Sequence, residues 1–339
     1  HPPRPLGPLP ADTPAPLVSA VLATRDPLET IAARVADLLA QDYPPDRLEV
    51  IVALDASAAT RLDETRAALT DPRVRVVAGD GPAGKPGALN AGVRAARGEI
   101  LLFADARQRF APDVTRRLVG ALVRDPSLGT ISGTVIRPDA SSAIVRAYAQ
   151  YDQRIREAEA RIDSSVGVMG AIYAARRAVW PALPDELILD DLYVPMRIVL
   201  DGLRVGVDLD AVAYETRATD GGTEAVRKVR TLTGNYQLMA WLPDVLVPWR
   251  NRVWASFYGH KVLRLTMPLA TAMMGLGALG VAVELAATDA RLLAVGSMAA
   301  AGALAIGRVR SLVLDVWRMH RAAALAFANG IRGRWHVWR

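Results

Sequence analysis

The sequence predicts an α/β fold in which an open, mostly parallel β-sheet is covered by helices. Along residues 17–237, short apolar runs alternate with longer segments of helical periodicity, and this order is typical of parallel sheets. Polar or charged residues directly follow several of the apolar runs. Ligands of such sheets bind beyond the carboxyl ends of the strands, so these polar residues are candidates for a site.

The elements follow one another in a regular order. Residues 1–16 hold many prolines and show no periodicity, so we expect a linker there. Apolar runs bounded by polar residues predict strands at 17–24, 48–54, 74–77, 99–103 and 130–136. Helical spacing predicts helices after Asp26 through Leu39 and at 88–97, 112–124 and 142–162. Asp26 is expected to cap the first of these helices, and Gly98 to end the second.

Composition limits the classes of protein that fit. The 339 residues suffice for one large domain with an appendage. The net charge of +6 comes mainly from Arg in a chain rich in Arg and Ala, a composition that reflects a GC-rich genome and does not by itself indicate a nucleic-acid partner. It fits a protein that binds phosphates and faces anionic lipid. The chain has no Cys, which excludes disulfides and thiolate metal sites. It starts at His1 rather than Met, so we expect a trimmed or incomplete start that leaves room for an upstream membrane segment.

Three polar sites follow predicted strands in order along the chain. Asp55 and Asp105 each end a strand, and the segment Gly84–Asn90 (Gly-Lys-Pro-Gly-Ala-Leu-Asn) lies between them. Each site has an ordinary alternative, because Asp is common in turns and helix caps and the Gly-Lys segment lacks the full Walker spacing. Their occurrence together in one sheet favours a site that handles a diphosphate and a ribose.

Two adjacent carboxylates, Asp190 and Asp191, follow the apolar run 187–189, and a basic helix around 227–237 comes after them. A positioned carboxylate is a suitable general base for a sugar hydroxyl, whose own pKa is far above neutral. The pair also suits a helix N-terminus, since 192–200 has helical character and Gly202 would end that helix. Both interpretations hold together, because a carboxylate at a helix start is well fixed.

On these motifs the chain resembles the family 2 glycosyltransferases of the GT-A fold, in the membrane-associated branch that includes cellulose, chitin and hyaluronan synthases. The resemblance runs from about Val18 to Gln237. It rests on six features: the first strand with its loop (Thr24, Arg25), the strand-end Asp (Asp55), the Gly-Lys motif (Lys85), the Asp-x-Asp position (Asp105), an acceptor-side Gly motif (Gly170) and the paired carboxylates (Asp190, Asp191).

The resemblance implies an inverting sugar transfer from a nucleotide-sugar, UDP-linked by expectation, to a lipid or glycan acceptor. Asp191 is the expected general base, and Asp190 is expected to raise the apparent pKa of the pair or to orient the loop. The expected donor-binding residues are Thr24, Arg25, Asp55, Lys85, Asp105, Arg107 and Arg230. Gly170 and Arg227 are expected on the acceptor side, and Mg²⁺ or Mn²⁺ is expected to bind through Asp105.

Two positions depart from the family pattern. Arg107 stands where the second Asp of Asp-x-Asp is usual, so metal dependence stays open: a guanidinium offsets diphosphate charge directly, or a cation binds through Asp105 and the substrate phosphates. Arg227 and Thr231 replace the Gln and Trp of the Gln-x-x-Arg-Trp motif, which argues against processive synthesis. A processive polysaccharide synthase and a non-catalytic nucleotide-sugar-binding membrane protein are the alternatives.

The last part of the chain, 246–339, differs in character from the catalytic domain expected at 17–245. Aromatic and basic residues at 248–263 predict a helix in a membrane interface. The apolar run 265–286 is long enough to span a bilayer, which takes about 20 residues, and 292–307 is a weaker second span, followed by a C-terminal interfacial segment. A buried helical hairpin in a soluble protein is the alternative for these two runs.

Basic residues flank both expected spans on the same side, which places the catalytic domain at the cytoplasmic face of a bacterial inner membrane. His260 is expected to pack in the interface rather than to bind a metal. The expected partners are therefore the nucleotide-sugar donor, a lipid or glycan acceptor and membrane lipids, with no nucleic acid and with an export partner left open.

Overall fold

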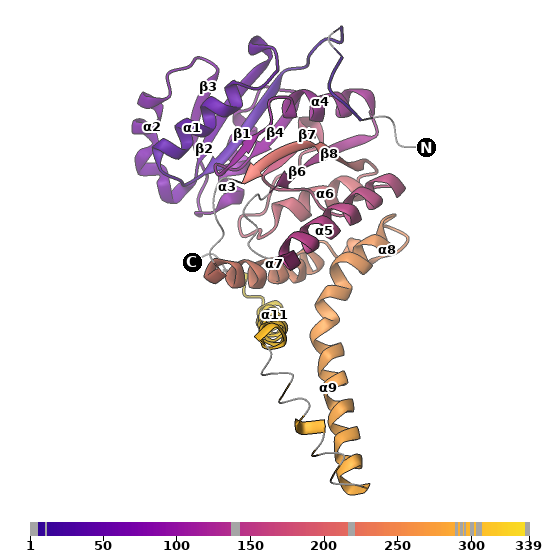
Figure 1. The fold of residues 1–339 in the computed structure, drawn as a ribbon. Coiled ribbons are helices and arrows are strands. Elements are labelled where there is room, and N and C mark those ends of the chain that lie inside the picture. The colour runs from indigo at the N-terminus through magenta and orange to yellow at the C-terminus, as the bar shows by residue number, and fades with distance from the viewer. Residues whose placement is uncertain are drawn as a thin grey trace.

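The computed structural model describes residues 6–10, 12–136, 143–215, 221–288, 291, 294, 296–298, 302 and 307–335. These residues form an eight-stranded sheet with the order β3-β2-β1-β4-β7-β6-β8-β5, flanked by helices (Figure 1). One buried cluster joins α1 and α4 to one face of the sheet, and a second joins α3, α6 and α7 to the other. The predicted fold class, a mostly parallel sheet flanked by helices, is confirmed.

The first half of the sheet is parallel. β1 (Val18–Thr24) lies between β2 (Leu48–Leu54) and β4 (Ile100–Ala104), and β3 (Val74–Ala78) lies beside β2. These strands are nearly continuous apolar runs because both faces of a helix-covered sheet are buried. In register, Thr24 pairs with Leu54 and Leu22 with Ala104. The residues that follow β2 and β4 therefore emerge at the same edge of the sheet.

The second half of the sheet is mixed. β7 (Ile172–Arg176) runs antiparallel between β4 and β6 (Leu128–Ile136). β8 (Arg204–Glu215) runs parallel to β6, and β5 (Gln108–Phe110) pairs antiparallel with β8. The sequence did not indicate β5, β7 or β8. β5 and β7 are short, and Asp208 and Asp210 interrupt the apolar pattern of β8.

Most of the predicted helices are present, with shifted ends. Their bounds are α1 (Leu28–Leu39), α3 (Lys85–Ala95), α4 (Val114–Arg124), α5 (Ala143–Ile162), α6 (Asp190–Leu200) and α7 (Gly221–Trp241). α2 (Leu62–Ala68) was not predicted. The predicted cap at Asp26 is wrong, since Pro27 is the N-cap of α1 and the Asp26 carboxylate accepts a hydrogen bond from Thr24 Oγ1 at 3.1 Å.

Gly98 does not end α3 as predicted, because that helix stops at Ala95 with Ala96 as its C-cap. Gly98 serves a close approach instead. A Cβ atom at this position would lie 2.5 Å from the backbone nitrogen of Ser19 on β1. Glycine is therefore needed where the chain enters β4.

The C-terminal part begins with a short helical turn, α8 (Trp254–Phe257), continues through a π-helical turn at Tyr258–Val262 and extends into α9 (Leu263–Thr288). The single interfacial helix predicted at 248–263 is therefore wrong in its extent, because Trp249 precedes the helical path and is 86% exposed. α9 projects away from the sheet (Figure 1). It exposes many large apolar side chains, among them Leu269, Met273, Met274, Leu276, Leu279, Val281 and Val283.

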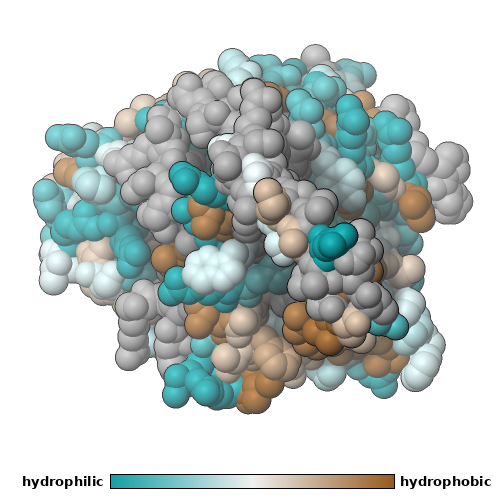
Figure 2. All heavy atoms as spheres, turned by 60° about the horizontal axis from the view of Figure 1, so that its bottom comes forward, coloured by the Kyte–Doolittle hydropathy of each residue, from teal (hydrophilic) through white to brown (hydrophobic). Residues whose placement is uncertain are grey.

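Within the described part of the chain, no single helix is long and apolar enough to cross a membrane. A bent pair, Trp254–Thr266 and Leu269–Leu285, meets that test together with a 47° angle between its halves. Most of the second span predicted at 292–307 lies outside the described residues. Figure 2 views the molecule from this end and shows apolar side chains gathered there.

The last helix, α11 (Gly307–Ile331), returns to the domain and packs against α7. The contact is close, because a Cβ atom at Gly330 would lie 3.0 Å from the Tyr236 side chain. Phe327 meets Tyr236 edge-on with ring centroids 6.0 Å apart, and Trp335 meets Trp241 at 6.3 Å. The segment predicted to be interfacial after 307 thus lies within a helix whose end covers α7.

Candidate active site

Lys85 links three segments at the carboxyl edge of the sheet. It is the first residue of α3, and its Nζ atom lies 3.2 Å from Asp105 Oδ1 and 3.4 Å from Asp190 Oδ2. Asp105 follows β4, and Asp190 starts α6. Residues far apart in the sequence thus meet at one ammonium group, as expected for the ends of parallel strands.

The charge of Lys85 is held by its neighbours. Burial lowers the pKa of Lys85, but the charges of Asp105, Asp190 and Asp191 outweigh this effect, and the pKa of Lys85 is raised overall. The group therefore stays cationic at neutral pH. A fixed cation at this position is well suited to meet the negative charge of a diphosphate.

The carboxylate pair occupies the first turn of α6, which agrees with both interpretations of Asp190-Asp191. The loop before it is tied to two helices. Asn90 of α3 binds both the oxygen and the nitrogen of Leu183, at 2.8 and 2.9 Å. Gln237 of α7 accepts from Ile188 N and donates to Glu186 O, each at 2.8 Å. These side-chain bonds replace regular secondary structure in positioning the pair.

Asp191 also lies close to the segment that contains Val168 and Gly170. Its carbonyl oxygen accepts a hydrogen bond of 2.9 Å from Val168 N. A Cβ atom on Gly170 would lie 3.3 Å from Asp191 Cβ and 3.7 Å from Asp191 Oδ2, so Gly170 leaves space beside the carboxylate. Burial, followed by the charge of Asp190, raises the pKa of Asp191 to about 6. A carboxylate with such a pKa is a more effective base near neutral pH than an ordinary one.

Arg230 approaches the same carboxylates from α7. Burial lowers the pKa of Arg230, while the charges of Asp191 and Asp190 raise it and Arg227 lowers it further. Arg230 is partly buried, whereas Arg227 is exposed. The site therefore has cations on two sides of the carboxylate pair, Lys85 from α3 and Arg230 from α7.

Tyr173 ends the acceptor-side Gly motif at 169–173 but was not predicted as a site residue. Burial raises the pKa of its hydroxyl well above the usual value, and Asp190, Asp191 and Asp105 act in the same direction. Its ring stacks on Phe103 of β4, with centroids 4.5 Å apart. Tyr173 reaches the site because β7 pairs with β4, a pairing between distant segments with no local signal in the sequence.

The loop after β1 forms the outer part of the site. Arg61, which the sequence also did not indicate, donates to the carbonyl oxygens of Asp26 and Arg25 at 2.9 and 2.8 Å. The Arg25 side chain is exposed, while Thr24 Oγ1 donates to Asp26 Oδ2 and accepts from Asp26 N. Arg107 is exposed, with Nη2 at 3.5 Å from Asp26 Oδ1.

Asp55 keeps the ordinary role that was the alternative for it. One carboxylate oxygen accepts from Ser57 N at 2.8 Å and from Ser57 Oγ at 2.6 Å, and so caps a short 3₁₀ turn. It remains at the edge of the sheet, directly after β2. The structure thus brings Lys85, Asp105, Asp190, Asp191, Arg230 and Gly170 together, while Arg25, Arg107 and Arg227 lie on the exposed rim.

The donor set for a divalent cation is small. Among the described residues no group of three or more His, Cys, Asp or Glu side chains is arranged to hold a metal ion. Asp105 offers one carboxylate beside Lys85. This fits Mg²⁺ or Mn²⁺ held by one protein carboxylate and by substrate phosphates, a common arrangement for Mg²⁺. It does not fit a preformed protein cage.

The N-terminal part of the chain is similar to a known protein family. Residues 19–179 match the model of glycosyl transferase family 2. Asp190, Asp191 and Arg230 lie beyond the matched range. The chain is 38% identical over 113 residues to a succinoglycan biosynthesis protein, ExoO, of Rhizobium meliloti (strain 1021), and the match covers 32% of this chain and 31% of that relative's length.

A solved structure resembles nearly the whole chain. It is the mannosyltransferase PcManGT from Pyrobaculum calidifontis in complex with GDP-Man and Mn²⁺, with a TM-score of 0.70 and 21% identity, covering 97% of this chain and 90% of that one. The likeness shows a shared fold, which is the GT-A type expected from the sequence. The matched family model, the succinoglycan relative and this shared fold together support a family 2 glycosyltransferase.

Proposed function

We propose that this protein is an inverting glycosyltransferase that moves one sugar from a nucleotide-sugar to a hydroxyl of a lipid or glycan acceptor, with Asp191 as the general base. The observation that carries the proposal is the placement of Lys85 between Asp105 and Asp190. Asp191 directly follows Asp190, and its pKa is raised to about 6. A cation for the leaving group and a base for the nucleophile thus occupy one site.

The reaction is a single displacement. The acceptor oxygen forms a bond to the anomeric carbon as its proton passes to the Asp191 carboxylate. The bond from the anomeric carbon to the donor phosphate breaks on the opposite side, so the configuration inverts. The electron pair leaves on the nucleoside diphosphate, whose growing charge meets Lys85 and Arg230.

A divalent cation would bind through Asp105 and the donor phosphates. When bound, it would neutralise diphosphate charge. Arg107 offers a guanidinium on the same rim, so the chain has a cation of its own where the family pattern has a metal ligand. The mannosyltransferase of similar fold is described with Mn²⁺, which supports a test with and without metal.

The donor is proposed to be a UDP-sugar, with GDP-sugars as the first competitor to examine because the structural neighbour holds GDP-Man. A role in polysaccharide assembly is supported by the relative named for succinoglycan biosynthesis. The exposed apolar residues of α9 and the bent helix pair support attachment to a bacterial inner membrane, with the site at the cytoplasmic face.

The test is release of free nucleoside diphosphate from a panel of UDP-, GDP- and dTDP-sugars, measured on the full chain in detergent with Mn²⁺, Mg²⁺ or EDTA. Asp191→Asn is expected to lower turnover by about 10²–10⁴-fold, the usual contribution of a positioned base, while nucleotide binding is retained. Asp185→Asn is the matched control, because Asp185 is an exposed carboxylate on the same loop.

The alternatives give different results. Full turnover in Asp191→Asn would contradict the assignment of the base. Nucleotide binding without release from any donor, in the presence of lipid and glycan acceptors, would indicate a non-catalytic binding protein. A long polymer rather than a single transfer would indicate a processive synthase.

A further inference from the structure

The π-helical turn at Tyr258–Val262 stands where the catalytic domain meets α9. A π turn takes one more residue than an α turn, and such turns occur often at functional sites. His260, at its centre, was expected at a membrane interface. It is instead 8% exposed and lies against α5. The extra residue turns His260 into the domain while the following helix presents apolar side chains outward.

His260 is held by two carboxylates of α5. Its Nδ1 atom lies 2.9 Å from Glu159 Oε1, and its Nε2 atom lies 3.4 Å from Asp152 Oδ1. Arg156, between them on the same helix, pairs with Asp152 at 2.9 Å. Glu159 is only 7% exposed, and a buried carboxylate is costly unless it is paired. This requirement fixes the π turn to α5.

The second oxygen of Glu159 continues the connection toward the proposed base. It accepts a hydrogen bond of 3.1 Å from Val166 N. Two residues later, Val168 N donates to the Asp191 carbonyl at 2.9 Å. Gly167 lies between them, and a Cβ atom there would come within 3.3 Å of the same Asp191 oxygen. The segment 166–168 is therefore held by Glu159 on one side and supports the Asp191 backbone on the other.

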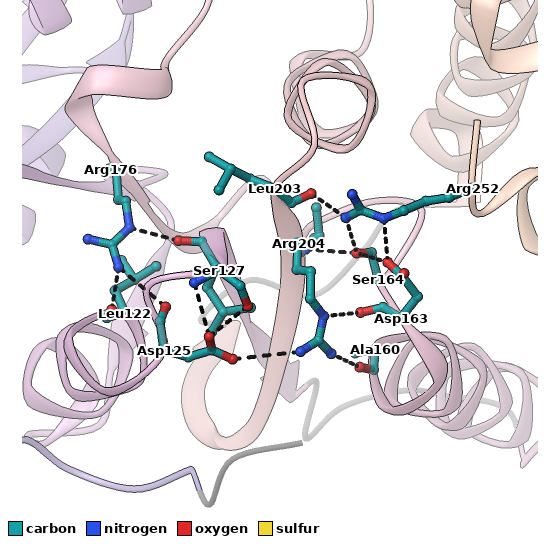
Figure 3. A network of polar contacts seen from close by, with 12 residues as sticks. Leu122, Asp125, Ser127, Ala160, Asp163, Ser164, Arg176, Leu203, Arg204 and Arg252 are labelled. Carbon is teal, nitrogen blue, oxygen red and sulfur yellow. Dashed lines mark hydrogen bonds and ion pairs between the residues drawn. The ribbon is translucent and has the colours of Figure 1, made fainter. Parts of the chain in front are cut away.

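The residues just before this segment are held by other hydrogen bonds. Arg204 donates to the carbonyl oxygen of Asp163 at 2.8 Å, and Arg252 donates to the Asp163 carboxylate at 2.9 Å (Figure 3). Ser164 Oγ accepts from Val205 N at 3.1 Å. Ser165 Oγ donates to Gly167 O at 2.8 Å, and Met169 N donates to Ser132 Oγ at 2.8 Å. The Glu159 contact is the one that ties 166–168 to α5.

Lys261 follows His260 in the π turn, and its charge acts on the same base. Burial lowers the pKa of Lys261, whereas Asp152, Asp191 and Glu159 raise it. In return, the charge of Lys261 lowers the pKa of Asp191. His260 and Lys261 thus reach Asp191 by two routes, through backbone support and through charge.

We propose that His260 is a positioning residue for the reaction: anchored by Glu159 and Asp152, it fixes the link between α5 and the segment 166–168 that supports Asp191, and it holds the π turn that carries Lys261. This inference rests on the proposed function, since it concerns the role of Asp191 as base. On this proposal, the full catalytic rate requires the contact between α5 and the π turn that leads into α9.

The first experiment compares His260→Phe with His260→Asn in the full chain. Asn places an amide nitrogen near the position of Nδ1 and keeps the bond to Glu159, while Phe keeps the ring and loses both polar contacts. His260→Phe is expected to lower kcat by about 10- to 100-fold, because small misplacements of a reacting group have effects of this size. The donor KM is expected to stay within about twofold. His260→Asn is expected to recover most of kcat.

The second readout is the pH profile of kcat/KM. The charged groups that act on Asp191 are Asp190 on α6, Lys85 on α3, Arg230 on α7 and Lys261 on the π turn. Moving Lys261 away removes an effect that lowers the pKa of Asp191. The acidic limb should therefore shift to higher pH in Lys261→Met and in His260→Phe, and stay in place in His260→Asn. A change in overall stability alone would not shift this limb.

The control is Glu157→Gln, two residues from Glu159 on the same helix, where the carboxylate pairs with Arg161 at 2.6 Å on the surface. It should leave kcat and the pH profile unchanged. Normal kcat in a folded His260→Phe, or equal losses in the Phe and Asn variants, would overturn the positioning role. If the Phe variant does not fold, Glu159→Met provides the same test because it removes the bonds to both His260 and Val166; reduced kcat is expected, and full kcat would contradict the proposal. Full activity in Asp191→Asn would instead overturn the proposed function itself.

Discussion

The two halves of the sheet place their functional residues by different means. In the parallel half, Asp55 and Asp105 reach the carboxyl edge of the sheet because each directly follows its strand, and Lys85 does so because it starts the helix after β3. In the mixed half, Asp190 and Asp191 follow a loop without regular structure. Their position depends on Asn90, Gln237 and Val168, all distant in the sequence.

This difference separates local from long-range determinants of one site. A residue set by its own strand stays in place as long as the sheet forms. A residue set by side-chain bonds from other elements moves when any of those bonds is lost. Variants in the parallel half should therefore change the chemistry of the site directly, and variants in the mixed half should change its geometry.

The largest effect is expected at Lys85, where the two halves meet. Lys85→Met removes the cation between Asp105 and Asp190 and leaves these carboxylates facing each other. We expect kcat/KM to fall by about 10²–10³-fold, as for the loss of one charge-stabilising group. Arg94→Met, on the same helix and paired with Asp80 at the surface, is the control. Steady-state diphosphate release measures both, and similar losses would contradict a specific role for Lys85.

The next effect is expected at Gln237, which represents the mixed half. Gln237→Leu leaves the nitrogen of Ile188 and the oxygen of Glu186 without their 2.8 Å partners. Unpaired buried polar groups of this kind cost about 1–3 kcal/mol, so urea unfolding should show a loss in that range together with a lower kcat. Asn329→Ala, which removes a 3.4 Å contact to Thr233 on the same helix, should have a smaller effect. Full kcat in Gln237→Leu would mean that the loop holds Asp191 without this anchor.

A third effect is a shift rather than a loss. The base acts only when ionised, so kcat/KM should be highest above a pH of about 6 and fall as the pH drops through the pKa of Asp191. Asp190 raises that pKa, so Asp190→Asn should move the acidic limb to lower pH. An unchanged limb, or one moved to higher pH, would show that the two carboxylates are not coupled.

The smallest effect is expected at Asp55, in the parallel half. Asp55→Ala removes the cap bonds to Ser57, and a lost cap costs about 1 kcal/mol of stability. Donor KM should rise while kcat changes little, since the base side is untouched. A fall in kcat comparable to that of Gln237→Leu would erase the distinction between the two halves.

The difference between residues placed by their own strand and residues placed by distant contacts also explains which features could be predicted from the sequence. The parallel strands and the residues after them were predictable, because apolar runs and polar strand ends are adjacent in the chain. β7 and Tyr173 were not predictable, because the pairing of β7 with β4 joins segments far apart. Arg61 gave no signal, because an Arg on a short helical turn is ordinary until its bonds to the loop after β1 are known.

Local rules failed where a neighbouring element competed. Asp26 lies at a plausible cap position, but its carboxylate accepts a hydrogen bond from Thr24 Oγ1. Gly98 is at a plausible helix end, but the tight approach to Ser19 determines that glycine. The aromatic stretch before α9 predicted that His260 packs rather than binds a metal, but its partner, a carboxylate of α5 about a hundred positions earlier, gave no local signal.

The packing of α11 against α7 determines whether the catalytic region can be separated from the rest of the chain. The helix that carries Arg230 and Gln237 completes its packing with residues 327–335, which the chain reaches only after α9. A protein shortened after residue 245, where the composition changes, would leave Tyr236 and Trp241 without their aromatic partners. Excision at that point would cut through a shared unit, so a truncated enzyme intended for crystallisation or engineering needs this tail rejoined by a linker.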